Sequence, residues 1–132
     1  MPRLAGFRLL IVEDDVHAAE ILQTALDVAE FPSEVAESGT DAFNLIMTSI
    51  QSGYPYDMVV CDVMIPGING LDLMKKVKEA NTTIGFVLVS AYEDENLSLQ
   101  KQAELEGALA FFSKPYDYKE LIRFIAQYKE GQ

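Results

Sequence analysis

Charged and hydroxyl side chains follow four short apolar runs of the sequence, and as a set they could bind a metal ion and phosphate. In chain order they are Glu13, Asp14 and Asp15, then Asp62, Ser90, and Lys114 with Pro115 behind it. Taken singly, each has an ordinary structural explanation, because acidic residues cap helices, aspartate is common in turns and lysine is usually solvated. Only their joint placement predicts chemistry.

Carboxylates that converge on one pocket repel one another, which favours a bound cation. Two unit charges about 4 Å apart at an effective dielectric of about 20 cost roughly 4 kcal/mol, a large share of a small domain's stability. Only oxygen ligands are available in this set, so the hard ion Mg²⁺ is the expected cofactor, and Mg²⁺ usually shares its coordination sphere with phosphate. Lys114 and Ser90 would then hold phosphoryl oxygens, which leaves Asp62 as a nucleophile able to form an acyl phosphate.

The apolar runs that precede these residues have the pattern of buried strands. They are continuous rather than alternating, as expected for strands covered on both faces of a parallel sheet. A weaker, alternating run at residues 33–37 is expected at an edge. The continuous runs lie at residues 7–12, 57–61, 85–89 and 108–112.

Between the runs the apolar residues recur with a helical period. The first helix is expected to bury Ile21 and Leu22, and the second to bury Leu45 after a cap at Thr40. The wide apolar stripe of the last helix is interpreted as core, with an interface as the alternative. The helical segments are predicted at residues 18–29, 42–50, 71–78, 97–105 and 117–129.

This strict alternation of strand and helix predicts the fold class. Parallel strands joined by right-handed crossovers give a doubly wound α/β domain with helices on both faces of the sheet. Ligands of such sheets bind beyond the carboxyl ends of the strands, where the charged residues stand. The length of 132 residues suits a single domain, residues 1–132, with its core at about residues 7–129.

Composition excludes several classes of function. The formal net charge of −11, from 21 acidic and 10 basic residues, argues against direct contact with nucleic acid. No run is long and apolar enough to span a membrane, and the first residues lack the apolar stretch of a signal peptide. One cysteine, Cys61, cannot form an intramolecular disulfide. We therefore expect a cytoplasmic protein that does not touch the membrane.

Four motifs together resemble the response-regulator receiver domains of two-component signalling. They are LLIVEDD at residues 9–15, DMVVCDVMIPGINGLDLM at residues 57–74, VLVSAY at residues 87–92 and FFSKP at residues 111–115. The resemblance implies a flavodoxin-like, five-stranded parallel sheet with strand order 2-1-3-4-5. It covers nearly the whole chain.

The resemblance also implies a role for each residue of the site. Asp62 matches the phosphoacceptor, and Asp14 matches the residue that ligates Mg²⁺ with Asp62. The other matching positions are Glu13 in the acidic pair of the metal site, the main-chain carbonyl of Met64 as a Mg²⁺ ligand, Ser90 and Phe111 as switch residues, Lys114, and Pro115 after a cis bond. Two features depart from the usual pattern, because Phe111 replaces a frequent tyrosine and the segment before residue 57 is long.

By the same resemblance, a histidine kinase or phosphotransfer protein would load Asp62 and change the surface formed by residues 97–105, 108–112 and 117–129. A downstream effector or a second copy of the chain, forming a homodimer, would bind that surface. The protein would be a signalling switch and not an enzyme. A receiver-like interaction module remains the alternative. An aspartate-nucleophile phosphatase is disfavoured because it needs a second aspartate where Met64 stands.

Overall fold

Five parallel strands form a single sheet in the order β2-β1-β3-β4-β5. The computed structural model describes residues 6–81, 83–90, 101–104 and 106–131 of the chain. The strands are β1 (Leu9–Val12), β2 (Ser33–Ala36), β3 (Met58–Asp62), β4 (Gly85–Ser90) and β5 (Ala110–Ser113). The predicted doubly wound α/β fold and its strand order are confirmed.

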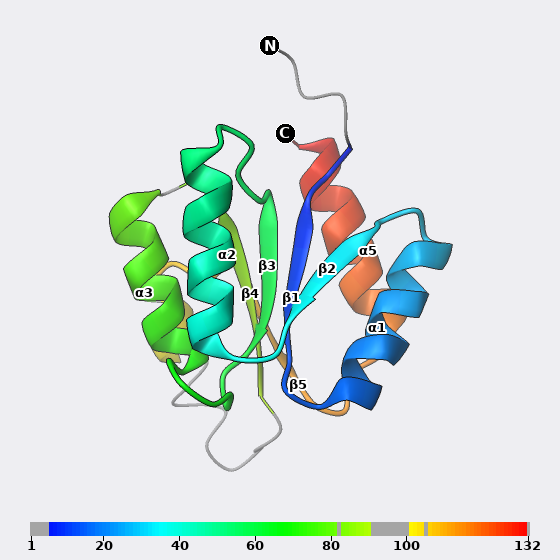
Figure 1. Cartoon of the computed structure of the whole chain (residues 1–132). Helices are drawn as coiled ribbons and strands as arrows, with labels where there is room; N and C mark the ends of the chain where they lie inside the picture. The colour runs from blue at the N-terminus through cyan, green and yellow to red at the C-terminus, as the bar shows by residue number, and fades with distance from the viewer. Residues whose placement is uncertain (1–5, 82, 91–100, 105, 132) are drawn as a thin grey trace.

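Helices cover both faces of this sheet, as Figure 1 shows. Helices α1 and α5 lie on one face, and α2 and α3 lie on the other. Their bounds are α1 (Val16–Val28), α2 (Gly39–Gln51), α3 (Gly70–Ala80) and α5 (Tyr118–Glu130). Of the helix predicted at residues 97–105, the structure describes only residues 101–104, which are helical; residues 97–100 and 105 lie outside the described part.

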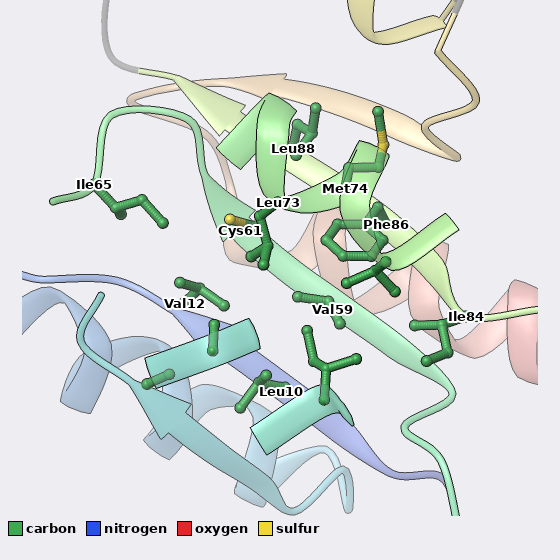
Figure 2. Close-up of a cluster of buried hydrophobic side chains, with 14 of the residues drawn as sticks. Leu10, Val12, Val59, Cys61, Ile65, Leu73, Met74, Ile84, Phe86 and Leu88 are labelled. Atoms are coloured by element: carbon green, nitrogen blue, oxygen red, sulfur yellow. The ribbon is translucent and has the colours of Figure 1, made fainter. Parts of the chain in front are cut away.

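The three central strands are buried along their whole length because both of their faces meet helices. Alternate residues of each strand enter different cores, as the strand period of two requires. In β1, Leu10 and Val12 face α2 and α3, whereas Leu9 and Ile11 face α1 and α5. Figure 2 shows the core between the sheet and helices α2 and α3, in which Phe86 of β4 is fully buried. These continuous apolar strands fix the positions of the residues at their carboxyl ends.

The strands and helices are displaced slightly from their predicted bounds. Strand β1 begins at Leu9 rather than at residue 7, and β5 begins at Ala110 rather than at residue 108. Asp62 and Ser90 are the last residues of β3 and β4 and do not follow them. The functional residues therefore belong partly to the sheet itself, where pairing with neighbouring strands holds their backbone.

Three predictions about the first two helices are wrong. Ile21 is 56% exposed and Leu45 is 38% exposed. The buried stripe of α1 contains Leu22 and Leu26, and Ile21 lies to one side of it. Helix α2 is capped by Ser38, whose hydroxyl accepts a hydrogen bond from the amide of Asp41, and not by Thr40. The cap lies two residues before Thr40 because α2 begins at Gly39, so Ser38 is the residue that directly precedes the helix.

No helix in the described residues is long and apolar enough to cross a membrane.

Candidate functional site

A lysine bridges two carboxylates at the carboxyl end of the sheet. Val12 of β1 pairs with Cys61 of β3, so the next residues along these strands, Glu13 and Asp62, are neighbours. The ammonium Nζ of Lys114 lies 2.8 Å from Oε1 of Glu13 and 2.8 Å from Oδ2 of Asp62. Residues separated by 101 and 52 positions in the sequence thus meet in one cluster.

Backbone amides hold the other oxygen of each carboxylate. The amide of Met64 donates to Oδ1 of Asp62 at 3.0 Å, and the amide of Asp15 donates to Oε2 of Glu13 at 3.1 Å. Glu13 is only 8% exposed and Asp62 is 9% exposed. Both carboxylates are therefore fixed in direction by the main chain, while Lys114 supplies their shared positive charge.

The surroundings of Lys114 keep it charged. Burial by itself would lower the pKa of Lys114, but the hydrogen bonds that its ammonium donates to Asp62 and Glu13, and the negative charges of both, outweigh burial and raise that pKa. The ammonium also offsets the repulsion between the two carboxylates. The repulsion from which we predicted a bound cation is thus offset in part by the ammonium of Lys114.

The predicted metal ligands are only partly brought together. Among the described residues, no group of three or more His, Cys, Asp or Glu side chains is placed to hold a metal ion. Asp14 is exposed beside the cluster, and Asp15 caps α1 by accepting hydrogen bonds from the amides of His17 and Ala18. Asp15 is therefore a structural residue at the start of α1.

The remaining predicted residues surround the cluster. Ser90 is fully buried at the end of β4, where its carbonyl accepts a hydrogen bond from the amide of Lys114 at 2.7 Å. The peptide bond between Lys114 and Pro115 is cis, as the resemblance implies. Phe111 pairs with Leu88 across β4 and β5, is partly buried and packs against the core beneath α2 and α3. The aromatic switch position is thus at the boundary between core and surface.

Cys61 lies directly beneath the cluster. Its Sγ donates to the carbonyl of Asp62 at 3.2 Å, and the side chain is completely buried. Burial, with smaller contributions from the charges of Asp62 and Glu13, raises the pKa of the Cys61 thiol. The thiol is an inert core group.

Two glycines that the sequence analysis missed hold the loop after β3. A Cβ atom at Gly39, the first residue of α2, would overlap the carbonyl oxygen of Ile68, and the amide of Gly39 donates to the carbonyl of Pro66 at 3.0 Å. A Cβ atom at Gly70 would lie 2.7 Å from the carbonyl oxygen of Asp62. Their signal in the sequence was weak, because glycine near a helix start also has ordinary explanations.

Tyr116 and Tyr118, which the sequence analysis also left out of the site, line a hollow of about 420 Å³ beside Lys114 and Glu13. The two rings meet edge to face at 5.3 Å between centroids. No sequence signal marked this hollow, because it forms between α1 and the segment that follows β5.

The family of this chain follows from its match to a family model. The model of the response regulator receiver domain matches residues 9–126. The chain belongs to the response-regulator receiver family.

This receiver domain is similar to part of several transcriptional regulators. The transcriptional regulatory protein CusR of Escherichia coli is 32% identical over 115 residues, which cover 87% of this chain and 48% of CusR. The DNA-binding transcriptional regulator NtrC of Klebsiella pneumoniae is 29% identical over 126 residues, or 92% of this chain and 25% of NtrC. The receiver domain thus spans about half the length of CusR and a quarter of NtrC.

Solved receiver domains have the same fold as this one. A putative response regulator from Chloroflexus aurantiacus is 30% identical with a TM-score of 0.80, covering 96% of this chain and 99% of that one. The receiver domain of Francisella response regulator 1452 has a TM-score of 0.84 at 24% identity, covering 95% and 98%. The CheY of a CheX-CheY-BeF3-Mg²⁺ complex from Borrelia burgdorferi has a TM-score of 0.79 at 22% identity, covering 92% and 88%.

Proposed function

We propose that this receiver domain accepts a phosphoryl group on Asp62 and thereby acts as a signalling switch. The observation that carries the proposal is the bridge from Lys114 to Asp62 and Glu13, with both contacts at 2.8 Å. One oxygen of Asp62 is held by a backbone amide and the other by an ammonium, which points the carboxylate in a fixed direction. Such preorganised charge is what phosphoryl transfer requires of a protein site.

The donor atoms suit Mg²⁺, which binds through one or two carboxylates, other oxygens and water. In our proposal, Asp14, Asp62 and the main-chain carbonyl of Met64 would hold the ion. When bound, Mg²⁺ supplies positive charge to the transferring oxygens. Glu13 has both of its oxygens engaged by Lys114 and the amide of Asp15, so we assign it to orienting the lysine and to balancing charge around the ion. Among solved relatives of this fold, the Borrelia CheY complex contains both BeF3 and Mg²⁺.

The side chains then divide the work of transfer. A carboxylate oxygen of Asp62 forms a bond to phosphorus, while the bond from phosphorus to the donor's histidine nitrogen breaks and leaves its electron pair on that nitrogen. Lys114 moves from bridging two carboxylates to binding a phosphoryl oxygen, which is a charge-assisted hydrogen bond. The hydroxyl of Ser90, at the end of the adjacent strand β4, binds another oxygen, and Phe111 repacks in response.

The proposal includes partners on both sides of the switch. A histidine kinase or a phosphotransfer protein donates the phosphoryl group in the cytoplasm. The surface around β5 and α5 then controls an effector protein or domain, or a second copy of the chain. The transcriptional regulators that this chain resembles are longer, which is consistent with effectors joined to receivers. The 132 residues would form one receiver domain, residues 1–132, with its core at about residues 7–129.

A second candidate is a receiver-like interaction module that takes no phosphate. One observation favours it: Lys114 already contacts both buried carboxylates and offsets part of their charge. The two functions differ in their response to a small phosphodonor, because only the phosphoacceptor forms a covalent adduct.

The test is incubation with acetyl phosphate and Mg²⁺, followed by intact-mass measurement. We expect an adduct of about 80 Da, the mass of one phosphoryl group, which is absent with a chelator and absent in Asp62→Asn. Asp15→Asn is the matched control, since it removes one carboxylate near the site but keeps a capping side chain; it should form the adduct. Wild-type protein that stays unmodified with every small donor would leave the interaction module as the function.

A further inference from the structure

Two cavities lie on either side of Tyr116. The outer one, of about 420 Å³, is bordered by Tyr118 and opens between α1 and the segment after β5. The inner one, of about 20 Å³, is bordered by Asp62. Four residues line both cavities and therefore lie at the boundary between them: Glu13, Leu22, Lys114 and Tyr116. The inner volume suffices for one water molecule and no more.

Neighbouring rings hold Tyr116 in this position. Its ring centroid is 5.5 Å from that of Phe112 in β5 and 5.3 Å from that of Tyr118 at the start of α5. Phe112 in turn packs edge to face on Phe124 of α5, at 6.4 Å. The ring of Tyr116 is therefore part of an aromatic row anchored on a strand and a helix, and its position does not depend on a loop alone.

The position of Tyr116 affects the ion pair formed by Lys114 and Asp62. Lys114 and Asp62 attract each other strongly only where water is excluded, because Coulomb energy falls as the local dielectric rises. Burial raises the pKa of the Tyr116 hydroxyl, and Tyr118, Glu13 and Asp62 act in the same direction, whereas Lys114 opposes them. The hydroxyl thus stays neutral at ordinary pH and adds no competing charge to the cluster.

We infer that Tyr116 is a positioning residue that closes the underside of the pair formed by Lys114 and Asp62 against water from the outer cavity. We assign this role to the ring and not to the hydroxyl, because the ring is the part of the side chain that packs on Phe112 and Tyr118. If Asp62 accepts a phosphoryl group, as proposed above, the same wall keeps Lys114 on the phosphoryl oxygens and slows hydrolysis of the acyl phosphate.

The shielding is tested without any phosphodonor, by the exchange of the Lys114 ammonium protons with water in protein labelled with ¹⁵N-lysine. The Lys114 signal is assigned by its loss in Lys114→Arg. We expect exchange in Tyr116→Leu to be about tenfold faster than in wild type, because the pair becomes exposed to a higher dielectric and to water. Leucine keeps apolar volume at this position, and the thermal unfolding of each variant is measured to check that it is folded.

Two variants test whether the faster exchange is specific to loss of the ring at position 116. Tyr116→Phe keeps the ring without its hydroxyl, and Tyr118→Leu makes the same change in a ring that borders only the outer cavity. Exchange in both should stay within about twofold of wild type, since both variants keep the ring at position 116 and its contact with Phe112. Equal acceleration by the two leucine variants, unchanged exchange in Tyr116→Leu, or no protected Lys114 signal in wild type would overturn the inference.

The decay of the acetyl phosphate adduct gives the second readout. If adducts form, that of Tyr116→Leu should decay about fivefold faster than that of Tyr118→Leu, because Lys114 is less firmly held on the phosphoryl oxygen. Equal decay rates would remove the role of Tyr116 in retaining the phosphoryl group. If wild type forms no adduct but its Lys114 exchange depends on Tyr116 as described, the proposed function fails while the shielding role stands.

Discussion

Polar clusters occupy both ends of the central strands, and they are built differently. At the carboxyl end, one lysine serves two carboxylates that are each about 10% exposed. At the amino end, Arg8 contacts Glu34 at 3.1 Å, with side chains that are 26% and 52% exposed. Arg8 also donates to the carbonyl of Tyr54 and stacks on the ring of Tyr56 at 4.4 Å, while its amide donates to Asp57 at 2.7 Å.

Arg8 makes a fixed set of contacts, whereas Lys114 can exchange its partners. The guanidinium of Arg8 has several donors in a rigid plane and satisfies an acid, a carbonyl and a ring at once, which pins the segment before β3 to β1. The ammonium of Lys114 is a compact charge on a flexible stem. It can leave one partner for another without breaking a planar geometry. The carboxyl end is therefore suited to a ligand, and the amino end is suited to holding a long connection in place.

Glycine substitutions give the largest expected contrast between the two ends. Gly39→Ala would force a Cβ atom onto the carbonyl of Ile68 and should cost about 3 kcal/mol of unfolding free energy. Gly53→Ala, at the amino end, has no atom within 4 Å of the new Cβ atom but keeps a φ of 85°, so it should cost only about 1 kcal/mol. Urea unfolding of both variants measures the difference. Equal losses would mean that the loop after β3 yields easily and does not constrain Asp62.

Removing the central cation of each cluster should give the next largest contrast. Lys114→Met leaves Glu13 and Asp62 adjacent and unpaired, at a cost of about 2 kcal/mol given their partial contact with solvent. Arg8→Met loses an exposed ion pair and a stacked ring, at a cost of about 1 kcal/mol.

The same pair of variants tests the idea that the carboxyl end accepts a cation. Millimolar Mg²⁺ should restore part of the stability of Lys114→Met, because the uncompensated carboxylates gain a counter-ion, and should leave Arg8→Met unchanged. Thermal unfolding with Mg²⁺ and then with a chelator measures this. If both variants respond equally to Mg²⁺, the effect is general screening and the comparison between the two ends loses its basis.

The last contrast concerns pH at the amino end. Burial and the adjacent Glu34 raise the pKa of Tyr56 to about 12. Because the folded protein holds this proton more tightly than the unfolded chain, with its pKa of about 10, Tyr56 contributes stability that is complete below about pH 10 and declines toward pH 12. Tyr56→Phe should show a shallower loss of stability over that interval. Parallel curves for the two proteins in urea would show that folding does not raise the pKa of Tyr56.

The fold could be predicted from the sequence because continuous apolar strands alternate with amphipathic helices. The cluster of Glu13, Asp62 and Lys114 could be predicted as well, since the carboxyl ends of parallel strands meet at one edge. Helix faces were less predictable, because Ile21 and Leu45 have helical spacing but lie outside the stripe that meets the sheet. Whether a residue faces the sheet depends on where the helix axis lies, which a single sequence does not specify.

Other features depend on contacts between distant segments and left no pattern to follow. Arg8 meets Tyr54 and Glu34 only once β1, β2 and the connection before β3 are assembled. Tyr116 forms a wall because α1 lies across from it. The role of Lys114 as the counter-ion of two carboxylates also depends on its reach across β4, whereas the sequence predicted a lysine directed at phosphate and a metal ion as the counter-ion.

The completely buried thiol of Cys61 can report on the local stability of the strand that carries Asp62. A thiol reagent reaches Cys61 only when the core between β3 and helices α2 and α3 opens, so the labelling rate measures rare local openings around that strand. Whatever binds at Asp62 and stabilises the closed sheet slows labelling by the same factor that it suppresses opening. The occupancy of the site can thus be read from the chemical reactivity of an adjacent residue that never contacts the ligand.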